Sequence, residues 1–260
     1  MYTTKEILEK TARGELTVDE AEKLLRMLSI VEVEVMAKID AHRERRNGIP
    51  EVVLAENKAT EDIIEITLRM LNENGRVMVS RCTTKQIEAL NQALPEGATI
   101  QVNDKAKMVI VKQKDFIIKQ TGGKIGLLTA GTSDIPVAEE AKVIAQEMGC
   151  QVYASYDVGV AGIHRLLEPL KDMIMNDVDV IIAVAGREGA LSSVVAGMVN
   201  VPVIAVPTSN SYGFGEKGVS TLMAMLQSCS LGLAVVNIDA GVSAGAVATL
   251  IANRAAKFRS

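Results

Sequence analysis

A short polar loop, Gly131-Thr132-Ser133-Asp134, has the residue types needed to bind a phosphate. It lies between a predicted strand and a predicted helix, and a helix N-terminus offers free N–H groups and a partial positive charge. The glycine lets the backbone approach a ligand closely. Alternatively, Ser133 or Asp134 only caps the helix. The loop matches neither the GxGxxG nor the P-loop arrangement, so it predicts a ligand site without identifying the nucleotide.

A second loop, Gly186-Arg187-Glu188-Gly189, follows the least polar predicted strand. Unpaired buried charge is unfavourable, so packing alone does not explain an arginine and a glutamate at this position. The two side chains could pair with each other at the surface and have no further role. We favour the interpretation that they contact a ligand.

A third polar loop runs from Asp157 to Arg165 and includes His164, one of only two histidines in the chain. It combines a carboxylate with an arginine, whose planar guanidinium suits phosphate. His164 and Arg165 could also be the ordinary exposed first turn of a helix. The loop is therefore a further candidate for substrate binding.

Cys229 is the strongest candidate nucleophile among three scattered cysteines, which form neither a disulfide framework nor a CxxC metal pair. It follows a Met-rich predicted helix and precedes a predicted strand. A lone cysteine is more often a small buried apolar residue than a nucleophile. Cys82 and Cys150 have weaker claims than Cys229.

The elements that would position these loops alternate regularly in the second half of the chain. Strands are predicted at 124–128, 151–156, 178–183, 203–206 and 233–236, and helices at 136–148, 163–175, 190–198, 218–226 and 242–254. Apolar strands and helices joined by short loops predict an α/β fold, a doubly wound parallel sheet with helices on both faces. Ligands of such sheets bind beyond the carboxyl ends of the strands, where the polar loops fall.

The first half is predicted to be a smaller α/β module. Thr17 and Glu20 could form a capping box before an apolar helix, and residues 30–35 alternate at period 2 and fit either a helix or a strand. Further strands are predicted at 51–55, 76–80, 100–103 and 108–112, and a helix at 60–72. Lys58 could contact phosphate, although a solvated charged face is the simpler interpretation.

Composition divides the chain near residue 120. Residues 1–120 contain 39 charged side chains and 4 glycines, whereas residues 121–260 contain 21 and 16. A packed α/β core joined to a more solvated module would give this contrast. We therefore predict an N-terminal module at 1–120 and a catalytic domain at 121–260.

The bulk properties exclude several partners. The net charge is −4, which argues against a nucleic acid bound by a basic face. No apolar run approaches the roughly 20 residues that a membrane span needs, and the N-terminus has no export pattern. We expect a cytoplasmic protein that acts on a small molecule.

The order of motifs in the second half resembles the aminoimidazole ribonucleotide carboxylase domain of purine synthesis. This resemblance implies a flavodoxin-like fold, a ribonucleotide phosphate at the 131–134 loop, CO2 chemistry at the second loop and assembly as a homo-octamer. The purine enzymes carry a histidine in the second loop, in a Gly-Ala-Ala-His-Leu-Pro-Gly pattern. Residues 189–197 contain no histidine here, and Glu188 and Cys229 are present instead.

The chain resembles the LarB family more closely and over nearly its whole length. The matching stretches are 40–51 with its Arg-Asn-Gly-Ile-Pro-Glu turn, Lys58, 129–134, 156–165, 186–190, 212–218 and 225–241. The resemblance implies the first step of nickel-pincer nucleotide synthesis. In that step CO2 or bicarbonate carboxylates the pyridinium ring of nicotinic acid adenine dinucleotide. Hydrolysis of the phosphoanhydride then releases AMP and pyridinium-3,5-biscarboxylic acid mononucleotide.

That chemistry needs a nucleophile because an electron-poor pyridinium ring cannot attack CO2 by itself. A thiolate can add to the ring, create an enamine-like carbon and later leave. We therefore expect Cys229 to be the nucleophile and Glu188 to handle the ring proton or position CO2. The expected substrate-binding residues are Gly131, Thr132, Ser133, Asp134, Asp157, His164, Arg165, Gly186, Arg187 and Gly189.

Cleavage of the phosphoanhydride could use Mg²⁺ held by Asp157 or Asp134, although the spacing indicates no ligand set, and no organic cofactor is expected. Two other functions stay open. One is an ordinary aminoimidazole ribonucleotide carboxylase or mutase, and the other is a non-catalytic dinucleotide-binding protein.

Overall fold

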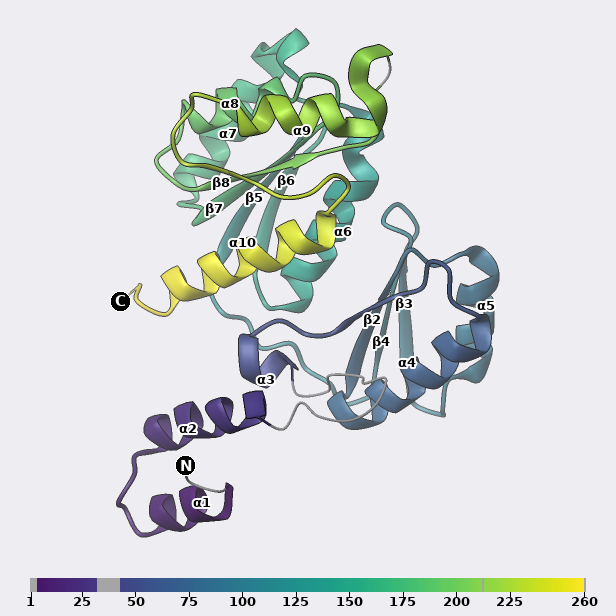
Figure 1. Ribbon diagram of the computed structural model, residues 1–260, viewed down its shortest axis with the longest axis vertical. Coiled ribbons are helices and arrows are strands. Elements are labelled where there is room, and N and C mark those ends of the chain that lie inside the picture. Colours follow the sequence, from purple (N-terminus) through teal and green to yellow (C-terminus); the bar gives the residue numbers. More distant parts are fainter. Residues whose placement is uncertain (1–3, 32–42, 212, 260) are drawn as a thin grey trace.

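The computed structural model describes residues 4–31, 43–211 and 213–259, which form two sheets with their helices and an N-terminal helix pair (Figure 1). The pair consists of α1 (Thr4–Ala12) and α2 (Val18–Val31). The predicted capping box is confirmed, since Thr17 N donates to Glu20 Oε2 at 2.9 Å and Glu20 N to Thr17 Oγ1 at 3.2 Å. Most of the alternating 30–35 segment lies outside the described residues.

The N-terminal module is built on a mixed four-stranded sheet with the order β1-β2-β4-β3. Its strands are β1 (Val52–Leu54), β2 (Arg76–Ser80), β3 (Thr99–Asn103) and β4 (Met108–Lys112), and the short helix α3 (Arg43–Asn47) precedes them. β1 runs parallel to β2, and the other pairs are antiparallel. The predicted strands therefore exist and pair within a few residues of their expected bounds.

Helices α4 (Thr60–Asn74) and α5 (Thr84–Ala93) pack against this sheet, where apolar side chains of both share a core with β1, β2 and β4. α4 ends at Gly75, which has a φ of 71° and donates its N–H to Leu71 O. This is the left-handed helix ending that glycine favours. α5 was not predicted from the sequence, and a capping box between Thr83 and Gln86 starts it.

The second domain has a five-stranded, fully parallel sheet with the order β6-β5-β7-β8-β9. Its strands are β5 (Lys124–Thr129), β6 (Gln151–Ser155), β7 (Val180–Ala185), β8 (Val203–Pro207) and β9 (Leu233–Val235). Numbered from β5, this order is 2-1-3-4-5, the flavodoxin-like arrangement. The predicted α/β fold class is confirmed.

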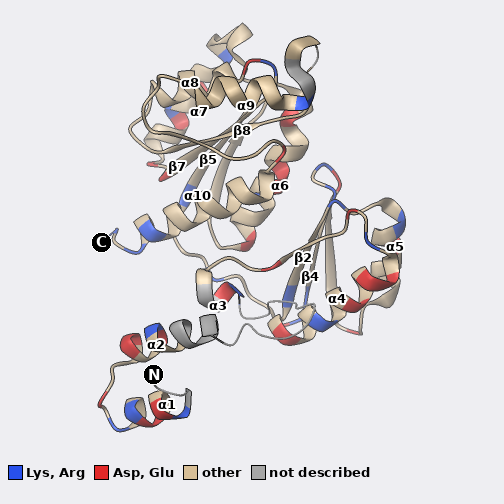
Figure 2. Ribbon diagram, viewed as in Figure 1, with Lys and Arg blue, Asp and Glu red and all other residues tan. Residues whose placement is uncertain are grey.

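Helices cover both faces of the parallel sheet (Figure 1). They are α6 (Ile135–Glu147) and α10 (Gly241–Ala256) on one face, and α7 (His164–Met175), α8 (Ala190–Ala196) and α9 (Val219–Leu226) on the other. β7 is buried along its whole length, because helices lie on both its faces and a strand lies on each side. Charged residues are concentrated on the N-terminal module and sparse in this domain (Figure 2), in keeping with the composition.

The two domains share an apolar interface. The second face of the N-terminal sheet contributes Met78, Met108 and Ile110, each no more than 2% exposed, to a cluster with side chains of α6 and α10. Burying a side chain of this size stabilises the fold by roughly 1.5–3 kcal/mol. The interface therefore fixes the N-terminal module on α6, the helix that follows the first polar loop. No helix in the described part of the chain is long and apolar enough to cross a membrane.

Candidate functional site

A pocket of about 450 Å³ opens beyond the carboxyl ends of β5 and β7. Its described lining residues are Ala130, Gly131, Ser133, Asp134, Gly159, Val160, Ala161, Ala185, Gly186, Arg187, Glu188, Ala190, Leu191 and Asn210. The loops that follow these two strands contain residues 131–134 and 186–189, which are the first two predicted ligand loops. The structure therefore brings the first two predicted loops together at the expected edge of the sheet.

Asp134 organises the first loop. It closes a short 3-10 turn, η1 (Thr132–Asp134), and is only 4% exposed. Its carboxylate accepts hydrogen bonds from Gly131 N at 2.9 Å and from Thr208 Oγ1 at 2.7 Å. Burial raises the pKa of Asp134, and these hydrogen bonds offset part of that effect. The Asp134 side chain thus fixes the loop and does not cap α6, contrary to the capping interpretation, and Gly131, Ser133 and Asp134 line the pocket.

The second loop places one carboxylate at the pocket mouth. Glu188 is exposed and lines the pocket beside Arg187, whose backbone has a φ of 54°. Ser211 Oγ accepts from Arg187 N at 3.0 Å, and Thr221 donates its hydroxyl to Arg187 O. Because these bonds hold the backbone, Glu188 is presented from a fixed turn to whatever occupies the pocket.

Two glycines of this loop have no room for a side chain. A Cβ on Gly186 would meet Thr208 Oγ1 at 2.9 Å, and one on Gly189 would meet Met225 at 2.9 Å. Gly189 also has a φ of 67°, in the left-handed region that glycine adopts without strain. Both predicted glycines are therefore required by the close approach of the loop to β8 and α9.

Thr208 and Asn210, after β8, hold the first ligand loop and were not among the predicted site residues. Thr208 is fully buried and holds Asp134, and Asn210 Nδ2 donates to Ser133 O at 2.6 Å. Their position after a parallel strand was the available signal, because every such position falls at the same edge. Together with the loop after β6, the loops of four adjacent strands line the pocket.

The third predicted loop lies beside the pocket and contributes Gly159 and Val160 to its lining. Asp157 and Arg165 form an ion pair at 2.6 Å, with both side chains partly exposed. His164 is exposed at the start of α7. Asp157 and Arg165 therefore belong to the rim, and the guanidinium is already engaged by a carboxylate.

Cys229 is not among the described residues that line this pocket. It is exposed, on the loop that leads from α9 back to the start of β9. Its neighbours fix the loop, since Ser228 Oγ lies 2.8 Å from Ser193 Oγ and Ser230 Oγ donates to Ser193 O at 2.8 Å. Cys82 and Cys150 are buried, and burial raises the pKa of Cys82 to about 11. Cys229 is accessible to a ligand, but the structure does not bring it to the pocket of its own chain.

The residues suggested for Mg²⁺ do not form a cation cage. In the described ranges, no group of three or more His, Cys, Asp or Glu side chains converges. Asp134 Oδ1 and Oδ2 each accept a hydrogen bond, and Asp157 pairs with Arg165. The protein side chains alone therefore do not fit a bound metal, and we derive no step through one.

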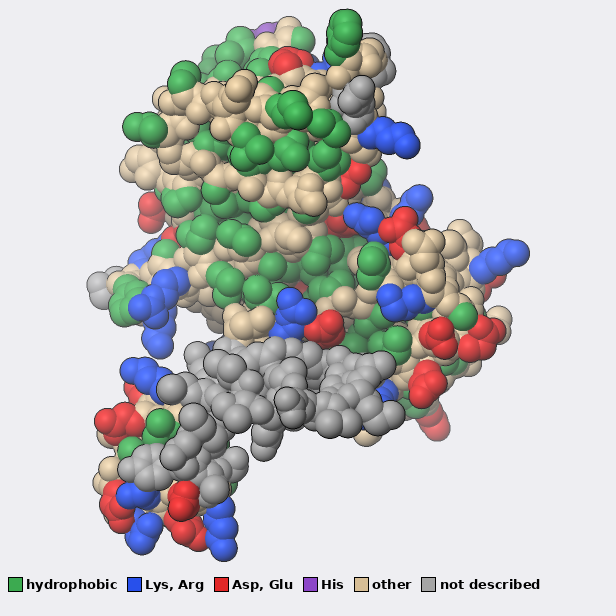
Figure 3. All heavy atoms as spheres, in the orientation of Figure 1, with side chains coloured by type: hydrophobic (Ala, Val, Ile, Leu, Met, Phe, Trp, Pro, Cys, Tyr) green, Lys and Arg blue, Asp and Glu red, His purple; other side chains and the backbone are tan. Residues whose placement is uncertain are grey.

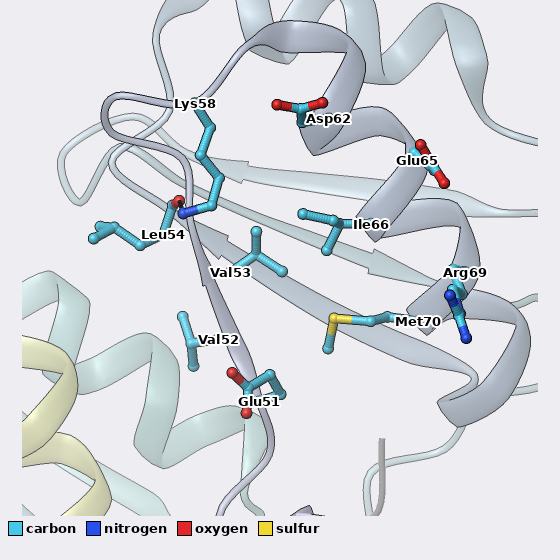
Figure 4. A pocket seen from close by; sticks show the side chains of 10 residues that line it. All are labelled: Glu51, Val52, Val53, Leu54, Lys58, Asp62, Glu65, Ile66, Arg69 and Met70. Atoms are coloured by element: carbon cyan, nitrogen blue, oxygen red, sulfur yellow. Dashed lines mark hydrogen bonds between the residues drawn. The ribbon is translucent and has the colours of Figure 1, made fainter. Parts of the chain in front are cut away.

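A larger groove of about 580 Å³ lies on the N-terminal module between β1 and α4 (Figure 4). Its floor is apolar, with Val53, Ile66 and Met70, and charged side chains stand around it. Lys58 Nζ donates to Leu54 O at 2.8 Å, so this ammonium is engaged by the backbone. None of the expected catalytic or substrate-binding residues lies here, so the smaller pocket is the better candidate site.

Comparison with known families matches both halves of the chain. A family model described as LarB/PurE-like N-terminal domain matches residues 31–114, and one described as AIR carboxylase matches residues 124–259. The second match spans the whole parallel sheet and every loop that the described lining residues place around the pocket.

Individual relatives agree with these matches. An uncharacterized protein of Methanocaldococcus jannaschii is 46% identical over 252 residues, which cover 95% of this chain and 96% of that protein. The N5-carboxyaminoimidazole ribonucleotide mutase of Thermotoga maritima is 29% identical over 133 residues, covering 49% of this chain and 74% of the mutase. The mutase of the same name from Pyrococcus horikoshii is 30% identical over 132 residues, covering 49% and 71%.

Proposed function

We propose a reaction for this chain from the premise that it belongs to the LarB family, in which a LarB/PurE-like N-terminal domain precedes an AIR carboxylase domain. The family places it among enzymes of the carboxylase and mutase type. We propose that it carboxylates the pyridinium ring of nicotinic acid adenine dinucleotide. Hydrolysis of the phosphoanhydride then releases AMP and pyridinium-3,5-biscarboxylic acid mononucleotide, the first step of nickel-pincer nucleotide synthesis. The predicted domains at 1–120 and 121–260 are part of this proposal.

The pocket supports a nucleotide substrate. Gly131 and Ser133 line the pocket beside the N-terminal end of α6, whose partial positive charge suits a phosphate. The purine enzymes carry a histidine in this loop, whereas residues 189–197 contain none and Glu188 lies at the pocket mouth. A carboxylate beside an apolar wall of Ala190 and Leu191 suits a cationic ring better than a neutral one. A carboxylate at the pocket mouth, in a loop without that histidine, is the single observation that carries the proposal of a pyridinium substrate.

The proposed carboxylation begins with Cys229. Its thiolate adds to a ring carbon, forming a C–S bond and dearomatising the ring. The enamine-like carbon of the adduct attacks CO2, formed from bicarbonate as co-substrate, and a new C–C bond forms. Glu188 accepts the proton from that carbon, and expulsion of the thiolate restores the pyridinium. The net change replaces C–H by a carboxylate and releases one proton.

Because Cys229 lies away from the pocket of its own chain, we propose that it serves the pocket of a neighbouring copy in a homo-oligomer. Apolar side chains gather on the face formed by α9 and α10 (Figure 3), with Met223 61% and Leu226 64% exposed. Leu231, two residues after Cys229, is 91% exposed. A second copy that docks on this apolar face would bury it. Docking would also bring the adjacent Cys229 thiol close to that second copy. We propose that this homo-oligomer is the octamer that the family resemblance implies.

Subunit mixing tests this arrangement. Cys229→Ser and Glu188→Gln variants, each inactive alone, should regain part of the wild-type activity after they are dissociated and reassembled together. In a mixed assembly some pockets keep Glu188 and receive an intact Cys229 from a neighbour. Absence of any recovery in a reassembled oligomer would mean that both residues act from one chain.

The competing function is that of the matched relatives, the N5-carboxyaminoimidazole ribonucleotide mutases. Their alignment covers the pocket domain, which favours their reaction as the second candidate function.

The decisive experiment incubates the protein with bicarbonate and Mg²⁺ and either the dinucleotide or aminoimidazole ribonucleotide, followed by mass spectrometry. A mononucleotide with one extra carboxylate, together with AMP, supports the proposal. Turnover of the aminoimidazole alone supports the purine reaction. Tight dinucleotide binding without turnover would indicate a non-catalytic binding protein.

A further inference from the structure

Arg81 reaches from the N-terminal module across the domain interface. It follows β2 in the left-handed region, with a φ of 55°, and its side chain is 42% exposed. Its guanidinium lies 2.9 Å from Glu56 Oε2 within its own module. In the other domain it donates to Asp239 O at 3.4 Å and lies 3.9 Å from Glu140 Oε1. One side chain therefore connects three acidic residues of three different segments.

Asp239 leads from Arg81 to the pocket. It follows β9, and its carboxylate Oδ1 accepts a hydrogen bond from Ser209 N at 2.9 Å. Ser209 lies between Thr208 and Asn210, the two residues that hold Asp134 and Ser133. A continuous series of contacts therefore connects Arg81 of the N-terminal module with the loop at residues 131–134.

Glu140 makes this contact point sensitive to charge. It is 8% exposed on α6, and its carboxylate accepts a hydrogen bond from the N-terminal backbone of α10 at Val242. The pKa of Glu140 is raised to about 7, mainly by burial and to a smaller extent by the charge of Asp239, while the charge of Arg81 and the hydrogen bond from Val242 lower it. Arg81 therefore favours the ionised carboxylate that it faces.

We propose that Arg81 is a positioning residue, through which the N-terminal module holds the Asp239 and Ser209 segments in the geometry that shapes the ligand pocket. This inference rests on the proposed function only where it is tested by enzyme activity. It gives the N-terminal module a role in catalysis without contact between the module and the substrate. Loss of this support should loosen the loop after β8, and small misplacements of binding groups can lower rates by up to about a hundredfold.

A second contact across the same interface supplies a matched control. Asn103, at the end of β3, donates from Nδ2 to Glu139 Oε2 at 2.7 Å. Glu139 also accepts from Lys142 Nζ at 3.1 Å and from the Tyr156 hydroxyl. Asn103→Ala therefore weakens the docking of the module on α6, while the hydrogen bond from Ser209 N to Asp239 is left in place. Arg69, exposed on α4 and paired with Glu73, is a control remote from the interface.

The test compares Arg81→Ala, Arg81→Lys, Asn103→Ala and Arg69→Ala in the full chain. Hydrogen exchange followed by mass spectrometry should show faster exchange at 207–211 in Arg81→Ala, partial protection in Arg81→Lys, and wild-type exchange there in the other two. In the same variants, kcat/KM for the dinucleotide should fall about tenfold in Arg81→Ala, recover in part in Arg81→Lys and change less than about twofold in the controls. Thermal midpoints identify any general loss of stability.

Equal effects of Arg81→Ala and Asn103→Ala at 207–211 would overturn the inference, because Arg81 would then act only by docking the module. Unchanged exchange at 207–211 in a folded Arg81→Ala would overturn it too. The exchange readout needs no turnover, so it stays decisive if the wild-type protein fails to convert the dinucleotide. That failure would count against the proposed function alone.

Discussion

Within one chain, Cys229 does not line the pocket, and the proposed chemistry must account for this separation. The thiol is exposed, whereas Cys82 and Cys150 are buried. Exposure leaves it available to a substrate held by another copy. Glu188, by contrast, is fixed at the pocket mouth by the backbone bonds of its loop. The proposed nucleophile and the proposed proton acceptor thus lie in different parts of the chain, and substitutions can test them separately.

Replacing Cys229 by serine should lower ring carboxylation by more than about a hundredfold, because an alcohol is a poorer nucleophile and a poorer leaving group than a thiolate. The measurement is the rate of carboxylated product formation. In the wild type, limited alkylation should label Cys229 before the two buried cysteines and should remove activity in parallel. Activity retained by a protein alkylated at Cys229 would contradict the proposed mechanism.

Replacing Glu188 by glutamine should lower kcat by about a hundredfold and change KM little, because the amide keeps the size of the side chain but cannot accept the ring proton. Steady-state kinetics with the dinucleotide provides the measurement. Glu168→Gln, at an exposed position on α7, is the matched control and should behave like the wild type. A large rise in KM with kcat unchanged would assign Glu188 to binding instead.

At the scale of elements, Thr208 shows how the strands hold the ligand loop. It follows β8, is fully buried and donates to Asp134 Oδ1 at 2.7 Å. Thr208→Val should remove this buried hydrogen bond, lower the free energy of unfolding by about 1–3 kcal/mol and raise the pKa of Asp134 further. Denaturant unfolding at neutral pH measures the loss. Thr208→Ser keeps the hydroxyl and should retain most of the stability. Equal losses in both variants would mean that the packing of the Thr208 side chain, and not its hydrogen bond, contributes the stability.

Much of this architecture could be predicted from the sequence because parallel strands buried on both faces have a plain signature. The run that forms β7 is apolar throughout and ends at a glycine, and the predicted polar loops after β5 and β7 do border one pocket. α5 was missed because few of its positions are apolar, although Thr83 and Gln86 gave a capping signal.

The partners inside the site could not be predicted in the same way. Thr208 lies 74 residues from Asp134 along the chain, so their hydrogen bond exists only after the sheet has formed. The position of Cys229 relative to the pocket depends likewise on how α9 crosses the sheet. Sequence identified the chemical types of these residues, and the fold decides which of them meet.

The whole molecule combines an apolar interdomain core with buried charges at its margin. Arg76 is nearly buried there and pairs with Glu44 at 2.9 Å and Glu147 at 3.6 Å, while Lys112 pairs with Glu147 at 2.7 Å. Removing one partner of such a network leaves an uncompensated charge, which is strongly destabilising. The N-terminal module is therefore held in one orientation, as its proposed positioning role requires.

Glu140 makes the stability of the molecule depend on pH. Its pKa is about 7 in the folded protein against 4.5 as the ordinary value, so the folded state binds the proton more tightly. The contribution of this group to stability is full below pH 4.5 and falls as the pH rises to 7, by as much as about 3 kcal/mol.

Glu140→Gln cannot ionise and should therefore gain thermal stability over the wild type, with a larger gain at pH 8 than at pH 4.5. Thermal melting at the two pH values measures the difference. Glu168→Gln should give no pH-dependent gain. A constant difference between Glu140→Gln and the wild type across this range would show that the Glu140 carboxyl does not titrate there.

Carboxylation of a pyridinium ring is the central claim, and isotope labelling tests it most directly. The protein is incubated with nicotinic acid adenine dinucleotide and ¹³C-bicarbonate, and the products are analysed by mass spectrometry. The proposed reaction predicts a pyridinium mononucleotide with one labelled carboxylate, together with unlabelled AMP. An unchanged dinucleotide, alongside label incorporated into aminoimidazole ribonucleotide by the same preparation, would contradict it and assign the pocket to the purine reaction.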